Sequence, residues 1–235
     1  MKTLVNGASF SRGPGSWPYH LKTVDQTKLV NLAQAGAGNT YIHESTTSEL
    51  YTRSYDLVII GWTGITRIDF RVSDIDMFSK SSYTSLNSYK WNDWAEKIID
   101  PLNDQDYVQK DWVFGCGHIN TDKTITNTGL FKGIYQYLNL QDFAYQFLIK
   151  VLGLQNTLKQ MNIPYLFTMH NFENDKSELQ KHTELYNSVD WNKVYLEYSL
   201  DQIMLDNNWY EADGLHPSVE AHKLHALLLD RYLNE

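Results

Sequence analysis

The sequence predicts an α/β fold in which helices cover both faces of a mainly parallel β-sheet. Short apolar runs at residues 4–6, 28–33, 56–62 and 165–169 indicate strands. The run at 56–62 is continuously apolar, as in a strand that is buried on both faces of a parallel sheet. Segments of helix length separate these runs, and such alternation favours right-handed crossover connections.

Helices are expected between and after these strands. Ser16 and Pro18 indicate a helix start, with the serine as cap and the proline in the first turn. A second helix is expected over residues 39–51. Apolar residues recur every three or four positions over 143–158, which predicts a helix with one apolar stripe. The last helix is expected to begin at Pro217.

The length of 235 residues favours one domain, and we expect a single domain over residues 1–235. Residues 71–141 fit the alternation of strands and helices less well. They contain Trp91, Trp94 and Trp112 among many serine, asparagine and aspartate residues. We therefore expect an insertion or cap over about 71–141, packed beside the functional site.

Charge and cysteine content exclude several classes of protein. The formal net charge is −8 and the basic residues are scattered, which argues against nucleic-acid binding. Cys116 is the single cysteine, so neither an internal disulfide nor a cysteine metal cluster is expected. The sequence shows no secretion signal and no apolar stretch of membrane length, so we expect a cytoplasmic protein without membrane contact.

Two further patterns have both an ordinary and a specific interpretation. Aromatic residues make up 14% of the chain and include 7 tryptophans, which suits either ordinary packing or a surface that stacks on sugar rings. His222 and His225 lie three positions apart on the last expected helix. No cysteine or carboxylate motif accompanies them, so we interpret them as core or surface histidines and expect no bound metal.

The two ends of the chain carry residues suited to nucleophilic catalysis. Ser9 follows the first expected strand, and Asp213 and His216 precede the last helix. A serine hydroxyl needs a base to become a nucleophile, and an imidazole oriented by a carboxylate supplies one. Ser11 is the rival nucleophile, although Ser9 lies closer to the strand end. The ordinary alternatives are a helix cap at Ser9 and a simple turn before His216.

A tetrahedral oxyanion would need preset hydrogen-bond donors. The backbone N–H groups of Ser9 and Gly36 suit this role, since both residues follow expected strands and glycine allows close approach of a ligand to the backbone. Gly38 competes with Gly36 for it. A side-chain donor would come from Asn39, which otherwise caps the second helix, or from the hydroxyl of Thr63.

These segments, in this order, resemble the four blocks of the SGNH hydrolase superfamily, the GDSL esterase and lipase group. Ser9 matches the first block, Gly36 the second, and Asp213 with His216 the closing Asp-x-x-His. The resemblance implies a three-layer α/β/α sandwich with a flavodoxin-like sheet, and ester hydrolysis by a serine mechanism without metal or cofactor. The residues within these blocks are similar to those of SGNH-like proteins from phages and environmental bacteria. A phage origin would also allow association with a virion.

The chain departs from the family pattern in two places. Ala8 stands where an aspartate is usual, a position that is mainly structural. The third block should read Gly-x-Asn, whereas this chain has Gly61-Trp62-Thr63. We expect a carboxylic ester hydrolase that removes small acyl groups such as acetyl, with an acylated carbohydrate as the substrate class. The alternative is a carbohydrate-binding or structural module, within a virion for example, that keeps the fold without turnover.

Overall fold

The structure is a computed structural model that describes residues 1–71, 112–115, 139–170, 172–212, 214 and 216–234. Five parallel strands form the central sheet in the order β2-β1-β3-β6-β7. Within this sheet the strands follow the 2-1-3-4-5 order along the chain, which is the flavodoxin-like order expected from the sequence. The strands are β1 (Thr3–Gly7), β2 (Leu29–Asn31), β3 (Leu57–Trp62), β6 (Tyr165–Met169) and β7 (Val194–Tyr195).

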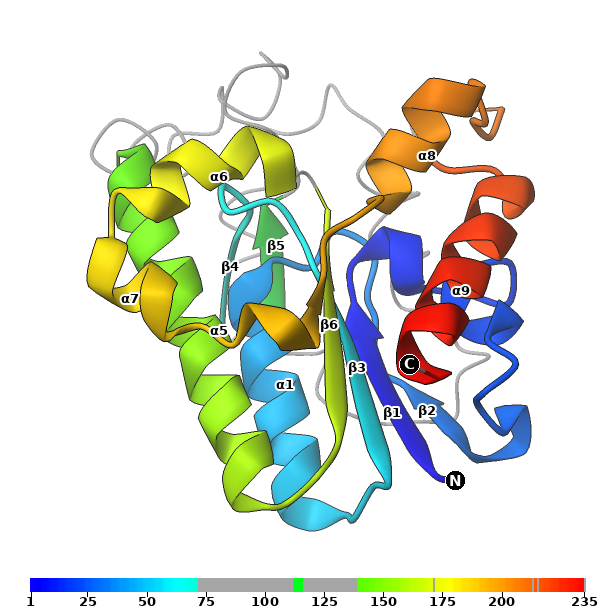
Figure 1. Cartoon of the computed structure of the whole chain (residues 1–235), viewed down its shortest axis with the longest axis horizontal. Coiled ribbons are helices and arrows are strands. Elements are labelled where there is room, and N and C mark those ends of the chain that lie inside the picture. The colour runs from blue at the N-terminus through cyan, green and yellow to red at the C-terminus, as the bar shows by residue number, and fades with distance from the viewer. Residues whose placement is uncertain (72–111, 116–138, 171, 213, 215, 235) are drawn as a thin grey trace, which may run out of the picture.

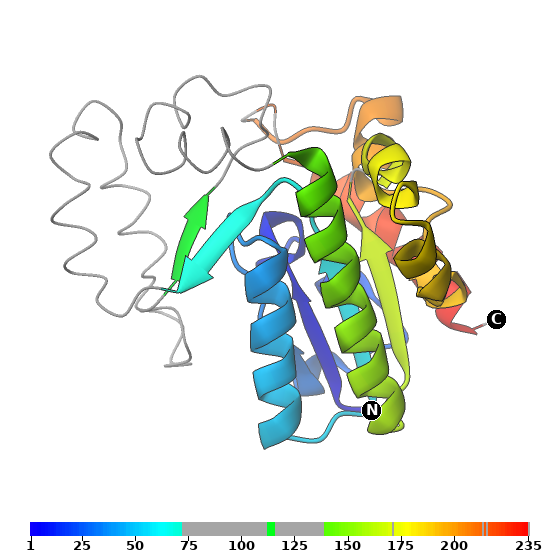
Figure 2. The same ribbon diagram turned by 90° about the vertical axis from the view of Figure 1, so that its left-hand side faces the viewer.

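Helices cover both faces of the sheet (Figures 1 and 2). Alternate residues of β3 divide between two apolar cores, since Val58 and Ile60 belong to one core and Ile59 to the other. The first core includes residues of α1 (Asn39–Thr52), α5 (Leu140–Gln160) and α6 (Phe172–Gln180), and the second residues of α8 (Leu200–Asn207) and α9 (Val219–Asn234). This burial on both faces explains the continuous apolar run of β3 and confirms the three-layer α/β/α architecture.

Most elements expected from the sequence are present, with some corrections at the ends. The second helix starts at Asn39 and the last at Val219, two residues after the expected start. The expected helix near Pro18 is a single 3-10 turn, Trp17–His20. Ser16 does not cap this turn, because its hydroxyl donates to the Gly13 carbonyl at 2.7 Å.

A second, two-stranded sheet stands beside α1 (Figure 2). Strand β4 (Ile68–Arg71) pairs antiparallel with β5 (Trp112–Gly115). The buried carboxylate of Asp69 accepts the backbone N–H groups of the first turn of α1, at 2.8 Å from Gly38, 3.2 Å from Thr40 and 2.8 Å from Tyr41. The cap of α1 therefore comes from another element. Most of the insertion expected over 71–141 lies outside the described residues.

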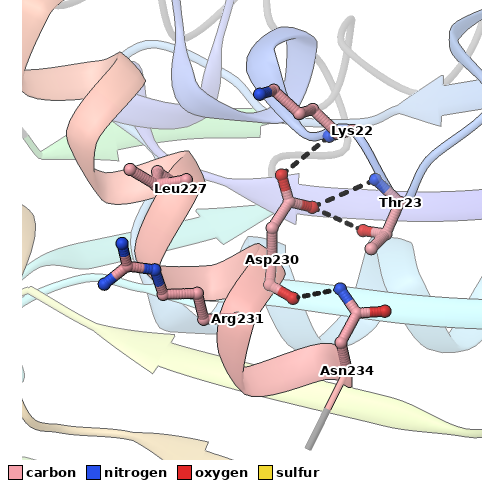
Figure 3. Close-up of a pocket in the computed structure, with 6 residues that line it drawn as sticks. All are labelled: Lys22, Thr23, Leu227, Asp230, Arg231 and Asn234. Carbon is pink, nitrogen blue, oxygen red and sulfur yellow. Dashed lines mark hydrogen bonds between the residues drawn. The ribbon is translucent and has the colours of Figure 1, made fainter.

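The C-terminal end of α9 is hydrogen-bonded to the segment at Lys22 and Thr23, which precedes β2 (Figure 3). Its Asp230 carboxylate accepts the backbone N–H groups of Lys22 at 2.8 Å and Thr23 at 3.1 Å, and the Thr23 hydroxyl. A hollow of about 560 Å³ lies beside this contact. In the described part of the chain, no helix is long and apolar enough to cross a lipid bilayer.

Candidate active site

Ser9 lies at the edge of the sheet where the strands end. Strand β1 ends at Gly7, which pairs with Gly61 near the end of β3, and Ser9 opens the helical turn Ser9–Ser11 directly afterwards. Ligand sites of open parallel sheets form at this carboxyl edge. The Ser9 side chain is half-buried. Because Ser9 is the first residue of the turn, its backbone N–H has no partner within that turn.

Ser11, the rival nucleophile, occupies a different environment. It is fully buried, and its hydroxyl accepts a hydrogen bond from Trp17 Nε1 at 3.1 Å. The hydroxyl lies over the paired glycines of β1 and β3: a Cβ atom on Gly61 would come within 2.8 Å of Ser11 Oγ, and one on Gly7 within 2.8 Å of Ser11 Cβ. The two glycines thus make room for Ser11 against the sheet, and its hydroxyl is enclosed there.

His216 lies close to the serine turn. Its ring is in edge-on contact with Phe10, the neighbour of Ser9, with ring centroids 5.7 Å apart. The loop that carries His216 is folded back on itself, since Glu211 N–H donates to the His216 carbonyl at 2.7 Å and Tyr210 bridges to Pro217. Residues from the two ends of the chain therefore meet. Asp213, expected to orient the histidine, lies outside the described residues.

The loop after β2 brings Gly36 to the same edge. Gln34 N–H donates to the carbonyl of Gly7 at 3.1 Å, which holds this loop against the end of β1. Gly36 has φ of +78°, a left-handed backbone that favours glycine. Gly38, its rival as an oxyanion donor, already donates its N–H to Asp69. The N–H of Gly38 is thus engaged in the cap of α1.

The Asn39 side chain joins α1 to the loop after β3. Its amide Nδ2 donates to the carbonyls of Thr63 at 3.1 Å and Gly64 at 3.3 Å, and its Oδ1 accepts the Thr63 N–H at 3.1 Å. Asn39 and Thr63 are both almost completely buried. Gly38, rather than Asn39, is the N-cap residue of α1. The two N–H groups of the amide thus face two backbone carbonyls, and Asn39 fixes the position of Thr63.

A histidine that sequence reasoning missed lies at the same edge. His170 directly follows β6, and its N–H donates to the Trp62 carbonyl at 3.0 Å. Its ring is 4% exposed and contacts Phe10 edge-on, with centroids 5.1 Å apart. Nδ1 of His170 lies 3.5 Å from the Asp201 carboxylate of α8. The signal was its place as the first residue after a predicted strand.

His222 and His225 of α9 lie in the same region. Burial is the largest cause that lowers the pKa of His222, to about 4, and the imidazoles of His170, His20 and His216 contribute. Burial also lowers the pKa of His225 to about 3. Both rings are therefore neutral at neutral pH. Within the described residues, no group of three or more histidine, cysteine or acidic side chains could hold a metal ion.

The tryptophans give limited support to a sugar-binding surface. Trp17 and Trp62 are fully buried in the two cores. Trp191 and Trp209 are partly buried and pack against those cores. The side chains of the other three tryptophans lie outside the described part of the structure.

Several solved structures have a similar fold. They include a protein of the G-D-S-L lipolytic family from Desulfitobacterium hafniense DCB-2 (TM-score 0.47, 13% identity, 99% of each chain covered). Two others are the psychrotrophic esterase EstA from Pseudoalteromonas sp. (0.46, 12%, 100% of each chain) and the acetylxylan esterase Axe2 from Geobacillus stearothermophilus (0.45, 12%, 100% of this chain and 97% of that one).

The chain is similar to all three over its full length. At these identities the likeness to GDSL/SGNH esterases concerns the fold alone. No protein-family model matches the sequence, and no curated protein matches it.

Proposed function

We propose that this protein is a serine-dependent carboxylic ester hydrolase with Ser9 as nucleophile, His216 as base and Asp213 as the carboxylate that orients the histidine. The observation that supports this most is the contact between Phe10 and His216, which brings the serine turn and the Asp-x-x-His segment together at the carboxyl edge of the sheet. Ser9 is half-buried whereas Ser11 is enclosed, which favours Ser9 as the group that meets a substrate.

In this proposal the reaction has two displacement steps. Ser9 Oγ transfers its proton to His216 and bonds to the acyl carbon, and the tetrahedral intermediate collapses with cleavage of the bond to the alcohol oxygen. The departing alcohol takes the proton from His216. Water then attacks the acyl-serine with His216 again as base, which releases the carboxylic acid and restores the Ser9 hydroxyl.

The oxyanion of each tetrahedral intermediate would accept hydrogen bonds from the backbone N–H groups of Ser9 and Gly36. The third donor is proposed at Thr63 or Asn39. Since the Asn39 amide faces the carbonyls of Thr63 and Gly64, we assign the donor to the Thr63 hydroxyl and give Asn39 the role of holding Thr63 in place. A hydroxyl offers one donor where the family's amide offers two, which predicts modest turnover.

The substrate class is proposed as a small acyl ester, acetyl above all, of a carbohydrate alcohol. Its support is compositional, since aromatic residues make up 14% of the chain and flat rings stack on sugar faces. Neither metal nor cofactor enters the proposed reaction. A phage-derived sequence would place the protein on a virion, and otherwise we propose the cytoplasm.

Labelling with a fluorophosphonate tests the nucleophile directly. The wild type should gain one phosphonyl group, which peptide mass spectrometry should locate on Ser9, and Ser9→Ala should gain none. Ser11→Ala is the matched control and should label as the wild type does. His216→Ala should lower ester turnover by about a thousandfold or more, since the serine then has no base. Equal labelling of the wild type and Ser9→Ala would refute the assignment.

The second candidate is a binding or structural module that keeps the fold without turnover. The contacts of Asn39 favour it, because they engage the amide that we considered as the side-chain donor to the oxyanion. Hydrolysis of p-nitrophenyl acetate at the background rate, together with retention on a glycan array, would support this module. Turnover that disappears in His216→Ala would exclude it.

A further inference from the structure

We propose that Asn31 is a positioning residue, whose side-chain amide ties the serine turn Ser9–Ser11 to the loop that carries Gly36. Its catalytic meaning rests on the proposed function, in which the backbone N–H groups of Ser9 and Gly36 bind the oxyanion together. The tie itself is a property of the folded chain, and it can be measured without any substrate.

The amide of Asn31 bonds a backbone group on each of two segments. Asn31 is the last residue of β2, and its pair with Val5 is the last of the ladder between β2 and β1. Its Nδ2 donates to the carbonyl of Ser11, twenty positions earlier in the chain, at 2.7 Å. Its Oδ1 accepts the N–H of Ala33 at 3.0 Å. One planar group therefore sets the distance between the end of the serine turn and the start of the loop after β2.

The serine turn depends on contacts with the rest of the fold. It is a single 3-10 turn, in which the Ser11 N–H donates to the Ala8 carbonyl at 3.0 Å, and so short a helix has little stability of its own. Two side chains bond its last residue. Trp17 Nε1 donates to the Ser11 hydroxyl at 3.1 Å, and Asn31 donates to the Ser11 carbonyl. Trp17 belongs to the second core, whereas Asn31 leads to the Gly36 loop.

The Gly36 loop has a defined shape of its own. Its Leu32 N–H donates to the Val5 carbonyl at 2.8 Å, which continues the β2–β1 contact beyond the ladder. The Ala37 N–H donates to the Gln34 carbonyl at 3.2 Å, and Gly36 is the third residue of the turn that this bond closes. A positive φ at the third residue alone is typical of a type II turn. The direction of the Gly36 N–H is thus set by the turn, and the place of the turn by the bonds before it.

Two donors on separate segments can serve one oxygen only if their separation is fixed. Each donor has to lie within about 3 Å of the oxyanion. A displacement of about 1 Å can cost about a hundredfold in rate. Loss of the Asn31 bonds would let the Ser9 N–H move relative to the Gly36 N–H. Asn31 would therefore act on the transition state through these two groups, without touching the substrate.

Hydrogen exchange of backbone amides, followed by NMR in the full chain, tests the tie. Asn31→Ala removes both bonds, so the serine turn opens more readily and the exchange of the Ser11 N–H should become about fivefold faster or more. Asn31→Asp separates the two bonds, because its carboxylate still accepts the Ala33 N–H but has no proton for the Ser11 carbonyl. It should speed the exchange at least as much, and it decides the matter if Asn31→Ala folds poorly.

Gln155→Ala is the matched control. The Gln155 amide also makes two backbone bonds, since it donates to the Asp190 carbonyl and accepts the Asp190 N–H, both at 3.1 Å. Asp190 precedes β7, which lies at the opposite edge of the sheet from β2. The control should lower the stability of the protein as well, but leave the exchange of the Ser11 N–H within about twofold of the wild type.

The catalytic effect is measured with an aryl acetate and its thiono analogue, in which sulfur replaces the carbonyl oxygen. Sulfur is a weak hydrogen-bond acceptor, so the ratio of the two kcat/KM values reports how well the donors meet the oxygen. Both Asn31 variants should lower this ratio by about tenfold, and Gln155→Ala should leave it unchanged. A loss of folded protein lowers both rates together and does not change the ratio.

The outcomes separate this inference from the proposed function. Faster exchange of the Ser11 N–H in both Asn31 variants supports the tie even if no fluorophosphonate reacts with Ser9, a result that would refute the proposed function alone. Unchanged exchange overturns the tie even if Ser9 is the nucleophile. If the wild type hydrolyses the acetate, a lowered ratio supports the positioning role, and a ratio that is unchanged in both Asn31 variants overturns it.

Discussion

Replacement of Asn39 by alanine should lower the free energy of unfolding by about 3 kcal/mol. The Asn39 side chain makes three hydrogen bonds to the loop after β3, with Thr63 N–H as donor and the Thr63 and Gly64 carbonyls as acceptors. Alanine offers none of them. Since Asn39 is 4% exposed, water would not readily replace the lost partners.

The magnitude follows mainly from the stranded N–H group of Thr63. A buried donor left without a partner costs about 1 to 3 kcal/mol, and each carbonyl adds a smaller cost because a carbonyl oxygen tolerates an unmade bond better. Thr47→Ala on the same helix is the matched control. Its hydroxyl bonds only the His43 carbonyl one turn earlier, so its loss should change stability by less than about 0.5 kcal/mol.

Urea unfolding followed by tryptophan fluorescence measures both variants, because the buried Trp17 and Trp62 report on both cores. A loss below about 1 kcal/mol in Asn39→Ala would refute the assignment of this amide to the loop. If that small loss came with labelling of Ser9 slowed about a hundredfold, the amide would instead serve the oxyanion directly.

Three other changes have defined outcomes. The pKa values of His222 and His225 lie below that of an unfolded histidine, so the unfolded chain binds more protons than the folded chain between about pH 6.5 and 4. The free energy of unfolding should therefore fall as the pH drops through this window. His222→Gln should reduce the slope of the unfolding free energy against pH by about 1.4 kcal/mol per pH unit. Burial raises the pKa of Asp175 to about 6, so the stability that the protonated carboxyl contributes is lost as the pH rises from about 4 to 6. Asp175→Asn should stabilise the protein by up to about 3 kcal/mol at pH 7 and leave its stability unchanged at pH 4. Urea midpoints at both pH values measure this difference. Gly7→Ala would place a methyl group 2.8 Å from Ser11 Cβ and should cost about 1 to 3 kcal/mol in the same urea assay, with much of the loss recovered in Gly7→Ala/Ser11→Gly.

Most of the central sheet could be predicted because β1, β3 and β6 are buried along their whole length. The run of β3 is continuously apolar, the run of β6 is apolar except for Thr168, and the spacing over α5 matches one buried stripe. Strand β7 has two residues, and α6 is mostly polar, so neither carries a periodic signal long enough to detect. The formation of β7 and α6 depends on packing against the core that the other elements make.

The places of the candidate site residues could be predicted where these residues follow a strand end. Ser9 and Gly36 lie at the expected edge, and His216 reaches the serine turn through Phe10. Asn39 was expected to be a cap or an oxyanion donor, yet its contacts depend on how the loop after β3 folds toward α1. Such contacts between distant segments leave no pattern in the sequence, and the same holds for the capping of α1 by Asp69.

The two-stranded sheet beside α1 is a place where the segment between β4 and β5 could be exchanged for another. Arg71 and Trp112 are paired in register, so the chain departs after β4 and returns at β5 at adjacent positions. Asp69 anchors this base to α1. Closing a loop twice as long adds only about 0.6 kcal/mol, so stretches of very different length could be grafted between these two strands. At the β4–β5 ladder the length of the chain could therefore vary, in evolution or in the laboratory, without change to the central sheet.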